Sequence, residues 1–326
     1  MARNTETSPM NASFTCPFCQ GQTFTTVQSQ IRDWEFGVAG SYAYRQCDGC
    51  GHLHLWPFPN VEALKLAYPP AYSAHVDEAS DRGWLYRILY ALNLWLFRRR
   101  FGQHIGPGSR VADIGCGNGE FLQTMRSFGV SRCVGIDFSE EACAKARAKG
   151  IEAFCGLYVD YPELEPFDAV FMNNYLEHVL DPVSEIAKTY QLLRPGGGYY
   201  GELPNWDSWD RRLFGRYWGG NHVPRHTYQF TPRLLQACLA RSGFQNIRIH
   251  QEPNPSVLLL SLQNWRQRHV RDLANNPRLQ CGRMSGFSVL MLVLLPFNAL
   301  ACLFGKSGII KFEAIKPKLP GAGGDS

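Results

Sequence analysis

The stretch from Val111 to Leu122, VADIGCGNGEFL, constrains the fold of this chain more than any other segment. It opens with apolar residues, passes through glycines at positions 115, 117 and 119, and continues as helix-forming sequence. This order is typical of a buried parallel strand that runs through a tight loop into a helix. Glycine lets the loop backbone touch a ligand and adopt conformations that a side chain forbids. The stretch therefore predicts a strand–loop–helix unit of an α/β fold, with a ligand at the loop.

The spacing of these glycines excludes two phosphate-binding loops. A dinucleotide fingerprint reads G-x-G-x-x-G, and in its two possible alignments the third glycine falls on Glu120 or Leu122. A P-loop needs Gly-Lys-Ser/Thr after its glycines, and this sequence does not follow. The pattern is instead D-x-G-x-G-x-G, which begins at Asp113.

This pattern resembles the nucleotide loop of class I S-adenosylmethionine-dependent methyltransferases. Further segments resemble those of the same family in the same order: RCVGID ending at Asp137, FDAVFMNNYLEHV from Phe167, LLRPGGG from Leu192 and FTPRLL from Phe230. The resemblance covers about residues 105–250. It implies a doubly wound, Rossmann-like α/β sheet with S-adenosylmethionine at the carboxyl ends of the strands.

The resemblance also indicates which residues hold the cofactor. The glycines would lie beside its methionine and ribose parts, and Asp137 can accept hydrogen bonds from both ribose hydroxyls. Relatives usually place an acid after the third strand to contact the adenine amino group. This chain has Leu157 in that region and its first acid only at Asp160, so Leu157 would offer apolar surface or a backbone group. The expected cofactor-binding residues are Asp113, Gly115, Cys116, Gly117, Gly119, Asp137, Phe138, Leu157 and Asn173.

Apolar runs and helix signals alternate along the chain, as a doubly wound sheet requires. Strands are predicted near 110–114, 132–136, 151–154, 167–172, 197–203, 245–250 and 309–315, and helices near 117–128, 139–149, 181–193 and 231–242. Ser139 is a predicted helix cap, and Arg194–Gly198 is predicted to break the chain before the fifth strand. The 326 residues, 45% hydrophobic, suffice for one such domain with appendages.

Two C-x-x-C pairs, Cys16/Cys19 and Cys47/Cys50, precede this core and are separated by sequence that alternates like a short β-meander. The N-terminus has no apolar signal region, so a reducing cytosol is expected and paired cysteines favour a metal over disulfides. Four thiolates suit tetrahedral Zn²⁺, and a site closed by four protein ligands is structural. His52 and His54 are alternatives for one thiolate. The sequence predicts a zinc ribbon at 13–60, after a disordered tail at 1–12.

A helical linker is predicted at 61–104. It would contain a short helix from Val61 to Tyr68, a polar segment at 71–83 and a helix at 84–97, which would cover the sheet or lie in a membrane interface. The ribbon, its proline-rich exit and the first helix resemble the N-terminal module of bacterial methyltransferases that modify surface glycans and sugars.

The methyltransferase core is predicted at 105–255 and 307–318, interrupted by an apolar insertion at 256–306. An uncharged run from Met284 to Gly305 is long enough to suggest a transmembrane helix. A single crossing would separate the last two strands, which must pair in one sheet. A bent or interfacial hairpin with peripheral membrane contact, or an apolar dimerisation or lid helix, therefore fits better, and Pro296 favours a bend.

Two histidines are candidate bases. His178 follows the fourth strand, where the methyl group of the cofactor should point, and histidine titrates near neutrality. His226 closes a long aromatic excursion from Asn205, which we expect to form an acceptor lid. Arginines 211, 212, 216 and 225, with His222 and His226, could bind an acidic or phosphorylated acceptor. Each of these side chains could instead be packed, paired or merely orienting.

The sequence therefore predicts a methyltransferase acting on a sugar, glycolipid or related small or lipid-linked acceptor. An RNA base methyltransferase and a quinone-type O-methyltransferase remain alternatives, as does a scaffold that has lost transfer. A net charge of +5 without a dense basic stripe does not favour a nucleic-acid partner. The expected location is the cytoplasm, with contact at the inner face of the membrane.

Overall fold

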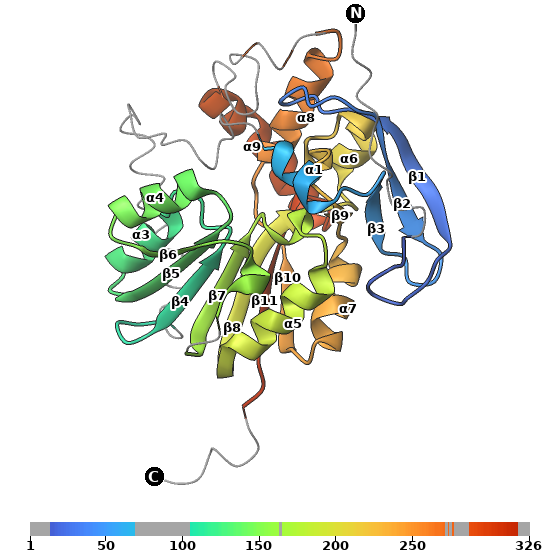
Figure 1. Ribbon diagram of the computed structural model, residues 1–326. Helices are drawn as coiled ribbons and strands as arrows, with labels where there is room; N and C mark the ends of the chain where they lie inside the picture. Colours follow the sequence, from blue (N-terminus) through green and yellow to red (C-terminus); the bar gives the residue numbers. More distant parts are fainter. Residues whose placement is uncertain are drawn as a thin grey trace, which may run out of the picture.

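The computed structural model describes residues 14–68, 105–162, 165–270, 273, 276 and 287–318. The predicted tail at 1–12, polar segment at 71–83 and helix at 84–97 lie outside these residues. Two sheets organise the described chain (Figure 1).

The larger sheet has the strand order β10-β11-β8-β7-β4-β5-β6. Its central strands are parallel, and β11 is antiparallel to both β8 and β10. The bounds are β4 Arg110–Ile114, β5 Arg132–Asp137, β6 Glu152–Cys155, β7 Phe167–Asn173, β8 Leu193–Pro204, β10 Gln245–His250 and β11 Ile309–Ile315. The predicted doubly wound α/β sheet is confirmed.

Helices connect these strands, and short polar side chains cap three of the four. They are α3 Glu120–Ser127, α4 Glu140–Ala148, α5 Pro182–Leu192 and α7 Pro232–Arg241. Ser139 caps α4 by accepting from the backbone N–H of Ala142, as predicted. Asp181 and Thr231 cap α5 and α7, each followed by proline at the first helical position, where no N–H is needed.

The smaller sheet has the order β1-β2-β3-β9 and is entirely antiparallel. Its strands are β1 Phe24–Ile31, β2 Tyr42–Cys47, β3 Leu53–Trp56 and β9 Tyr228–Gln229. The first three form the blue sheet at the edge of the molecule opposite α3 and α4 (Figure 1). The fourth comes from the core, so the cysteine-bearing ribbon is joined to the core by strand pairing.

An apolar cluster also holds the ribbon in place. It contains buried residues from the ribbon (Ile31, Tyr44, Leu53, Leu55) and from the excursion after β8 (Trp206, Trp218, Val223). It also contains Val257, from the insertion between β10 and β11, and Ile309, from the start of β11. Burial of such side chains contributes about 1.5–3 kcal/mol each. The excursion therefore packs between the ribbon and the core. It folds into the helices α6 Trp209–Phe214, η4 Gly215–Tyr217 and η5 Gly219–Asn221.

Between β10 and β11 lie two helices, α8 Ser256–Arg266 and α9 Phe287–Leu303. The apolar run forms one helix with Pro296 inside it, which fits the predicted alternative of an apolar helix better than that of a hairpin. None of the helices in the described ranges is both long and apolar enough to cross a membrane.

Candidate functional site

The glycine loop and Asp137 lie side by side, as the sequence predicted. The backbone N–H of Gly117 donates to Oδ2 of Asp137 (2.9 Å) and that of Ser139 donates to Oδ1 (2.9 Å). The N–H of Gly115 donates to the carbonyl of Ile136 at the end of β5 (2.8 Å). These bonds fix the carboxylate at the strand end, and its remaining lone pairs are available to a ligand.

The loop requires glycine for two reasons. Gly115 and Gly119 have φ values of +76° and +78°, in the left-handed region. A Cβ at Gly115 would also come within 2.7 Å of the Tyr175 ring. Beneath the loop, Asp113 is buried in β4, and burial, with a further contribution from Asp137, raises its pKa well above the usual value.

A cavity of about 820 Å³ opens above the carboxyl ends of the parallel strands. Pockets of roughly 300–1,000 Å³ are typical of small-molecule sites. Five of the expected cofactor residues line it: Gly115, Asp137, Phe138, Leu157 and Asn173. Four others lie outside its lining, in β4 or in the loop below it: Asp113, Cys116, Gly117 and Gly119. Leu157, directly before η2 (Tyr158–Asp160), and Val159, within it, are exposed and offer apolar surface to a flat ring.

Three histidines line the other part of the cavity. The ring of His226 lies with its centroid 4.5 Å from that of His178 and 4.8 Å from that of His222. Burial is the largest cause that lowers the pKa of each well below its ordinary value. At neutral pH the three imidazoles are therefore neutral and each keeps a basic nitrogen. The structure brings the two predicted candidate bases together.

Hydrogen bonds fix the tautomers of two rings. Nδ1 of His226 lies 2.9 Å from the carbonyl of Gly220, which can only accept, so Nδ1 carries the proton. Nε2 of His222 accepts from Nε of Arg225 (2.9 Å), so its Nδ1 donates to the Glu35 carboxylate (2.7 Å).

Glu35, Lys65 and Tyr68 also line the cavity, and the sequence did not single them out. Glu35 comes from the connection between β1 and β2, whereas Lys65 and Tyr68 belong to α1 (Val61–Leu66) and the residues that follow it. The Tyr68 hydroxyl lies 2.8 Å from Nδ1 of His178, and its ring packs edge-on against Phe138. Glu35, Lys65 and Tyr68 reach the cavity because the N-terminal part of the chain packs on the core. Local sequence patterns do not predict such packing.

The four arginines proposed to bind an acidic acceptor are engaged elsewhere. Arg211 lies over the Trp206 ring, Arg212 pairs with Asp207, Arg216 donates to Gln30, and Arg225 pairs with Asp33. Within the described chain, none of the four contributes to the cavity lining, although His222 and His226 do. The structure therefore gives no support to an arginine-based anion site here.

Arg225 connects three parts of the molecule. Both of its terminal nitrogens donate to the Asp33 carboxylate (3.1 and 3.0 Å), and they donate as well to the carbonyls of Ala67 and Val223. Together with the bond from Nε to His222, all five guanidinium N–H groups have acceptors. Arg225 and Asp33 are fully desolvated, at 0% and 1% side-chain exposure.

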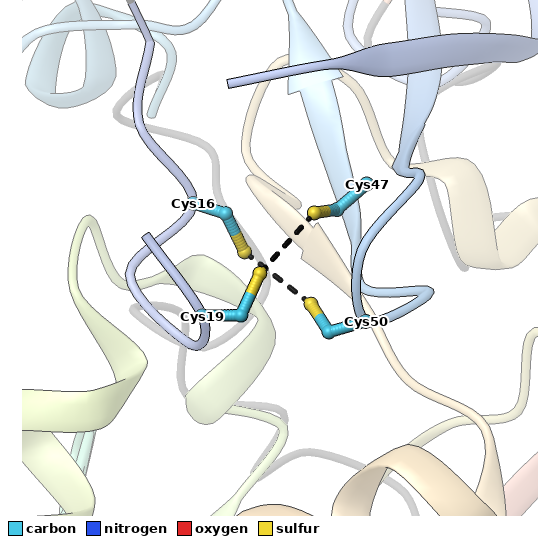
Figure 2. A group of neighbouring side chains, drawn as sticks. All are labelled: Cys16, Cys19, Cys47 and Cys50. Atoms are coloured by element: carbon cyan, nitrogen blue, oxygen red, sulfur yellow. Dashed lines mark hydrogen bonds between the residues drawn. The ribbon is translucent and has the colours of Figure 1, made fainter. Parts of the chain in front are cut away.

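The four predicted metal ligands also lie together (Figure 2). Sγ of Cys16 is 3.5 Å from that of Cys50, and the Cys19–Cys47 separation is also 3.5 Å. Tetrahedral zinc with Zn–S bonds of about 2.3 Å would place its sulfurs about 3.8 Å apart, whereas a disulfide needs about 2.05 Å. A Cβ at Gly21 would lie 3.3 Å from two of these sulfurs, so the backbone closely surrounds the group. The donor set and spacing fit Zn²⁺.

His52 and His54 do not belong to the cysteine group, and of the two His52 contacts it. Nδ1 of His52 is 3.4 Å from Sγ of Cys50, and Nε2 is 3.0 Å from Sγ of Cys238 in α7. His54 stacks on Phe14. His52 thus links the cysteine cluster to the core.

Comparisons with known proteins agree with this geometry. A family model described as a methyltransferase domain matches residues 89–249. A ubiquinone biosynthesis O-methyltransferase from Aromatoleum aromaticum is 34% identical over 174 residues, which cover 48% of this chain and 73% of that protein. Another from Thiobacillus denitrificans is 32% identical over 198 residues, which cover 56% of this chain and 81% of that protein. The match to a third, from Hahella chejuensis, is 38% identical over 104 residues and spans 29% of this chain and 42% of that protein.

Among solved structures, a SAM-dependent methyltransferase from Archaeoglobus fulgidus aligns with a TM-score of 0.46 and 18% identity, over 71% of this chain and 100% of that one. The glycine loop, the carboxylate beside it and the match to 73% of a curated relative lead to one conclusion. The chain belongs to the S-adenosylmethionine-dependent methyltransferase family.

Proposed function

We propose that this methyltransferase transfers a methyl group to a sugar, a glycolipid or a related lipid-linked acceptor, at the cavity above β4, β5 and β7. The observation that carries the proposal is the continuity of that cavity. One part is lined by the glycine loop, Asp137 and Leu157, and the other by three neutral histidines. A cofactor and an acceptor can therefore lie in contact within one cavity.

The residues present fit S-adenosylmethionine. Asp137 would accept from the ribose hydroxyls, Leu157 would cover the adenine, and the loop at Gly115 would follow the methionine part. The bound cofactor supplies an electrophilic methyl group. The protein contributes alignment of the two reactants, which can supply about 7–11 kcal/mol of the barrier. His178 or His226, neutral at pH 7, would accept the proton that the acceptor loses.

The insertion supports a lipid-linked acceptor. Val257 and Leu260 of α8 line the cavity, and α9 exposes Val289, Val293 and Leu300. From residue 256 to 311 the sequence has basic residues at 266, 268, 271, 278, 283, 306 and 311 and one acid, at 272. Exposed apolar side chains among basic residues are the combination that binds anionic bilayer surfaces. The proposed location is therefore the cytoplasmic surface of a membrane.

A quinone-type acceptor is the second candidate. It is favoured by the curated relatives, which are named ubiquinone biosynthesis O-methyltransferases. A hydroquinone with an isoprenoid chain would use the same apolar approach to the cavity.

Transfer of radiolabelled methyl from S-adenosylmethionine tests these proposals. The acceptors offered in parallel are nucleotide sugars, a glycolipid extract and a synthetic hydroquinone with an isoprenoid tail. Label in the sugar or glycolipid fractions, lost in Asp137→Ala, supports the first proposal, and label only in the hydroquinone supports the second. Titration calorimetry with S-adenosylhomocysteine serves as the control, because absence of binding would refute both.

A further inference from the structure

Glu177 is a buried carboxyl that the proposed function does not use. It lies in η3 (Leu176–His178), directly after β7, and is 1% exposed. Neither of its carboxyl oxygens has a hydrogen-bond partner among the described residues. Burial raises its pKa to about 8, so the group holds a proton at neutral pH. Burying a carboxyl group without a hydrogen bond costs free energy, so a hydrogen-bonding partner is expected at this position.

Two imidazole nitrogens face this carboxyl. Nε2 of His178 lies 4.0 Å from Oε1 of Glu177, and Nε2 of His226 lies 3.8 Å from the same oxygen. The backbone holds the second distance, because Thr227 donates its N–H to the carbonyl of Glu177 (2.8 Å). Gaps of this size close by an approach of about 1 Å or through one bridging water.

The outer nitrogen of each ring is already committed. The Tyr68 hydroxyl contacts Nδ1 of His178, and the carbonyl of Gly220 accepts from Nδ1 of His226. Among Tyr68, the two histidines and Glu177, only one arrangement lets every group donate in the same direction, and the backbone carbonyl of Arg225, which also contacts the His178 ring, can only accept. In this arrangement the Tyr68 hydroxyl donates to Nδ1 of His178, and Nε2–H of His178 donates to one carboxyl oxygen of Glu177. The carboxylic O–H of Glu177 then donates to Nε2 of His226, and Nδ1–H of His226 donates to the carbonyl of Gly220.

We propose that Glu177 is a positioning residue that carries the shared proton of a continuous chain, Tyr68–His178–Glu177–His226, in which Glu177 connects two histidines of the cavity lining from behind. The inference rests on the proposed methyl transfer, since it specifies where the proton of the acceptor goes. The chain sets which nitrogen of each histidine is basic before the acceptor arrives.

The proton step balances along this chain. As the acceptor forms its bond to the methyl group, its X–H proton passes to the Tyr68 oxygen and the Tyr68 proton passes to Nδ1 of His178. The Nε2 proton of His178 passes to Glu177, and the carboxyl proton passes to Nε2 of His226. S-adenosylmethionine, when bound, would supply the methyl group by cleavage of its sulfonium S–CH₃ bond and would lose one positive charge, so the charge formed on His226 would leave the net charge of the cavity unchanged.

Other ionisable groups surround Glu177, and each is relevant to a pH measurement. They are His222 and Arg225 from the segment after η5, Glu202 and Tyr199 from β8, and Tyr44 from β2.

The test is long-range ¹H–¹⁵N correlation spectroscopy of the full chain with ¹⁵N-labelled histidine, recorded from pH 6.5 to 9.5. Signals are assigned with His178→Gln and His226→Gln. We expect His226 protonated at Nδ1 and His178 at Nε2, with both Nε2 signals shifting together near pH 8. Glu177→Gln can form both of the proposed hydrogen bonds but cannot titrate, so the common shift should vanish. Tyr68→Phe should release the fixed tautomer of His178.

Glu185→Gln is the matched control, because Glu185 is also buried, lines the cavity and has its pKa raised to about 8 by burial. The proposal is overturned if the common shift survives Glu177→Gln, if Glu185→Gln abolishes it, or if wild type shows no shift. A shift of both Nε2 signals on adding one equivalent of Mg²⁺ or Zn²⁺ would also overturn it, because a cation would then occupy the place of the proton. Calorimetry with S-adenosylhomocysteine separates the two proposals, since it reports cofactor binding whatever the spectra show.

Discussion

Replacement of Arg225 by methionine should strongly destabilise the protein, because this arginine is a fully buried structural residue and not the acceptor-binding residue that the sequence suggested. The change removes all five guanidinium N–H groups, whose acceptors belong to the ribbon, α1 and the segment around His222. Methionine keeps most of the apolar stem of arginine, so the loss is mainly electrostatic and polar.

The magnitude follows from what remains unpaired. Breaking a buried ion pair by removing one partner costs about 3–5 kcal/mol. Asp33 still accepts from the backbone N–H groups of Glu35, Phe36 and Val38, which favours the lower half of that range. Two carbonyls would lose donors, at about 1–3 kcal/mol for each that stays buried. Taking the lower ends of these ranges together, we expect a total loss of about 5 kcal/mol, which is a large part of the roughly 5–15 kcal/mol typical of a folded domain.

The assay is urea unfolding followed by tryptophan fluorescence and far-UV circular dichroism. Arg216→Met is the matched control, since Arg216 also joins this segment to the ribbon, through an exposed bond to Gln30 of 3.0 Å. Its loss should cost less than about 1 kcal/mol. Equal midpoints for the two variants would refute the reasoning, and so would an Arg225→Met midpoint equal to that of wild type.

Further expectations concern the ligands, pH and the apolar helix. Asp137→Ala should weaken S-adenosylhomocysteine binding about 10-fold to 100-fold by calorimetry, because a charged acceptor of hydrogen bonds contributes about 1.5–3 kcal/mol; unchanged affinity would contradict the assigned role. Cys47→Ser should reduce bound zinc, measured by mass spectrometry of the metal, from one ion per chain to a small fraction, and retention of a full equivalent would exclude the site. The pKa of His226 is lowered in the folded state, so this histidine takes up a proton only when the protein unfolds. The free energy of unfolding should therefore fall as the pH drops below about 6.5, by about 1.4 kcal/mol per pH unit for each histidine of this kind. His226→Gln should reduce that slope in urea unfolding between pH 6.5 and 5, and an unaltered slope would contradict it. Leu300→Asp should abolish sedimentation with anionic vesicles while Val27→Asp, at an exposed valine of the ribbon, leaves it intact; wild type that stays in the supernatant would refute membrane contact.

Local patterns predicted the central sheet because its strands are apolar and bounded by glycine, proline and capping residues. The glycine-rich stretch at 194–198 was misread as a break. β8 already begins at Leu193, because the backbone of Gly196 and Gly197 exchanges hydrogen bonds with Lys316 beyond β11 (2.9 Å each). These partners keep the stretch in the sheet although Gly196 has a φ of +82° and the pairing with β7 shifts register there. A local signal cannot report partners that are distant in sequence.

The same limit explains the acceptor side of the cavity. His178 and His226 could be nominated from their motifs, but their juxtaposition depends on how the excursion after β8 folds against the ribbon. Arg225 is the clearest example: its charge suggested a phosphate ligand, whereas its acceptor is Asp33, distant in sequence. Glu35 and Tyr68 carry no signal of their own and reach the cavity through docking alone.

The pairing of β3 with Tyr228–Gln229 means that the ribbon is not a portable module. A fragment ending after Phe58 would leave the outer edge of β3 with unsatisfied backbone groups, and bare edges of this kind recruit other chains. Grafting the ribbon onto another enzyme would therefore require the host to supply a matching two-residue strand, and an excised ribbon should self-associate even when loaded with zinc.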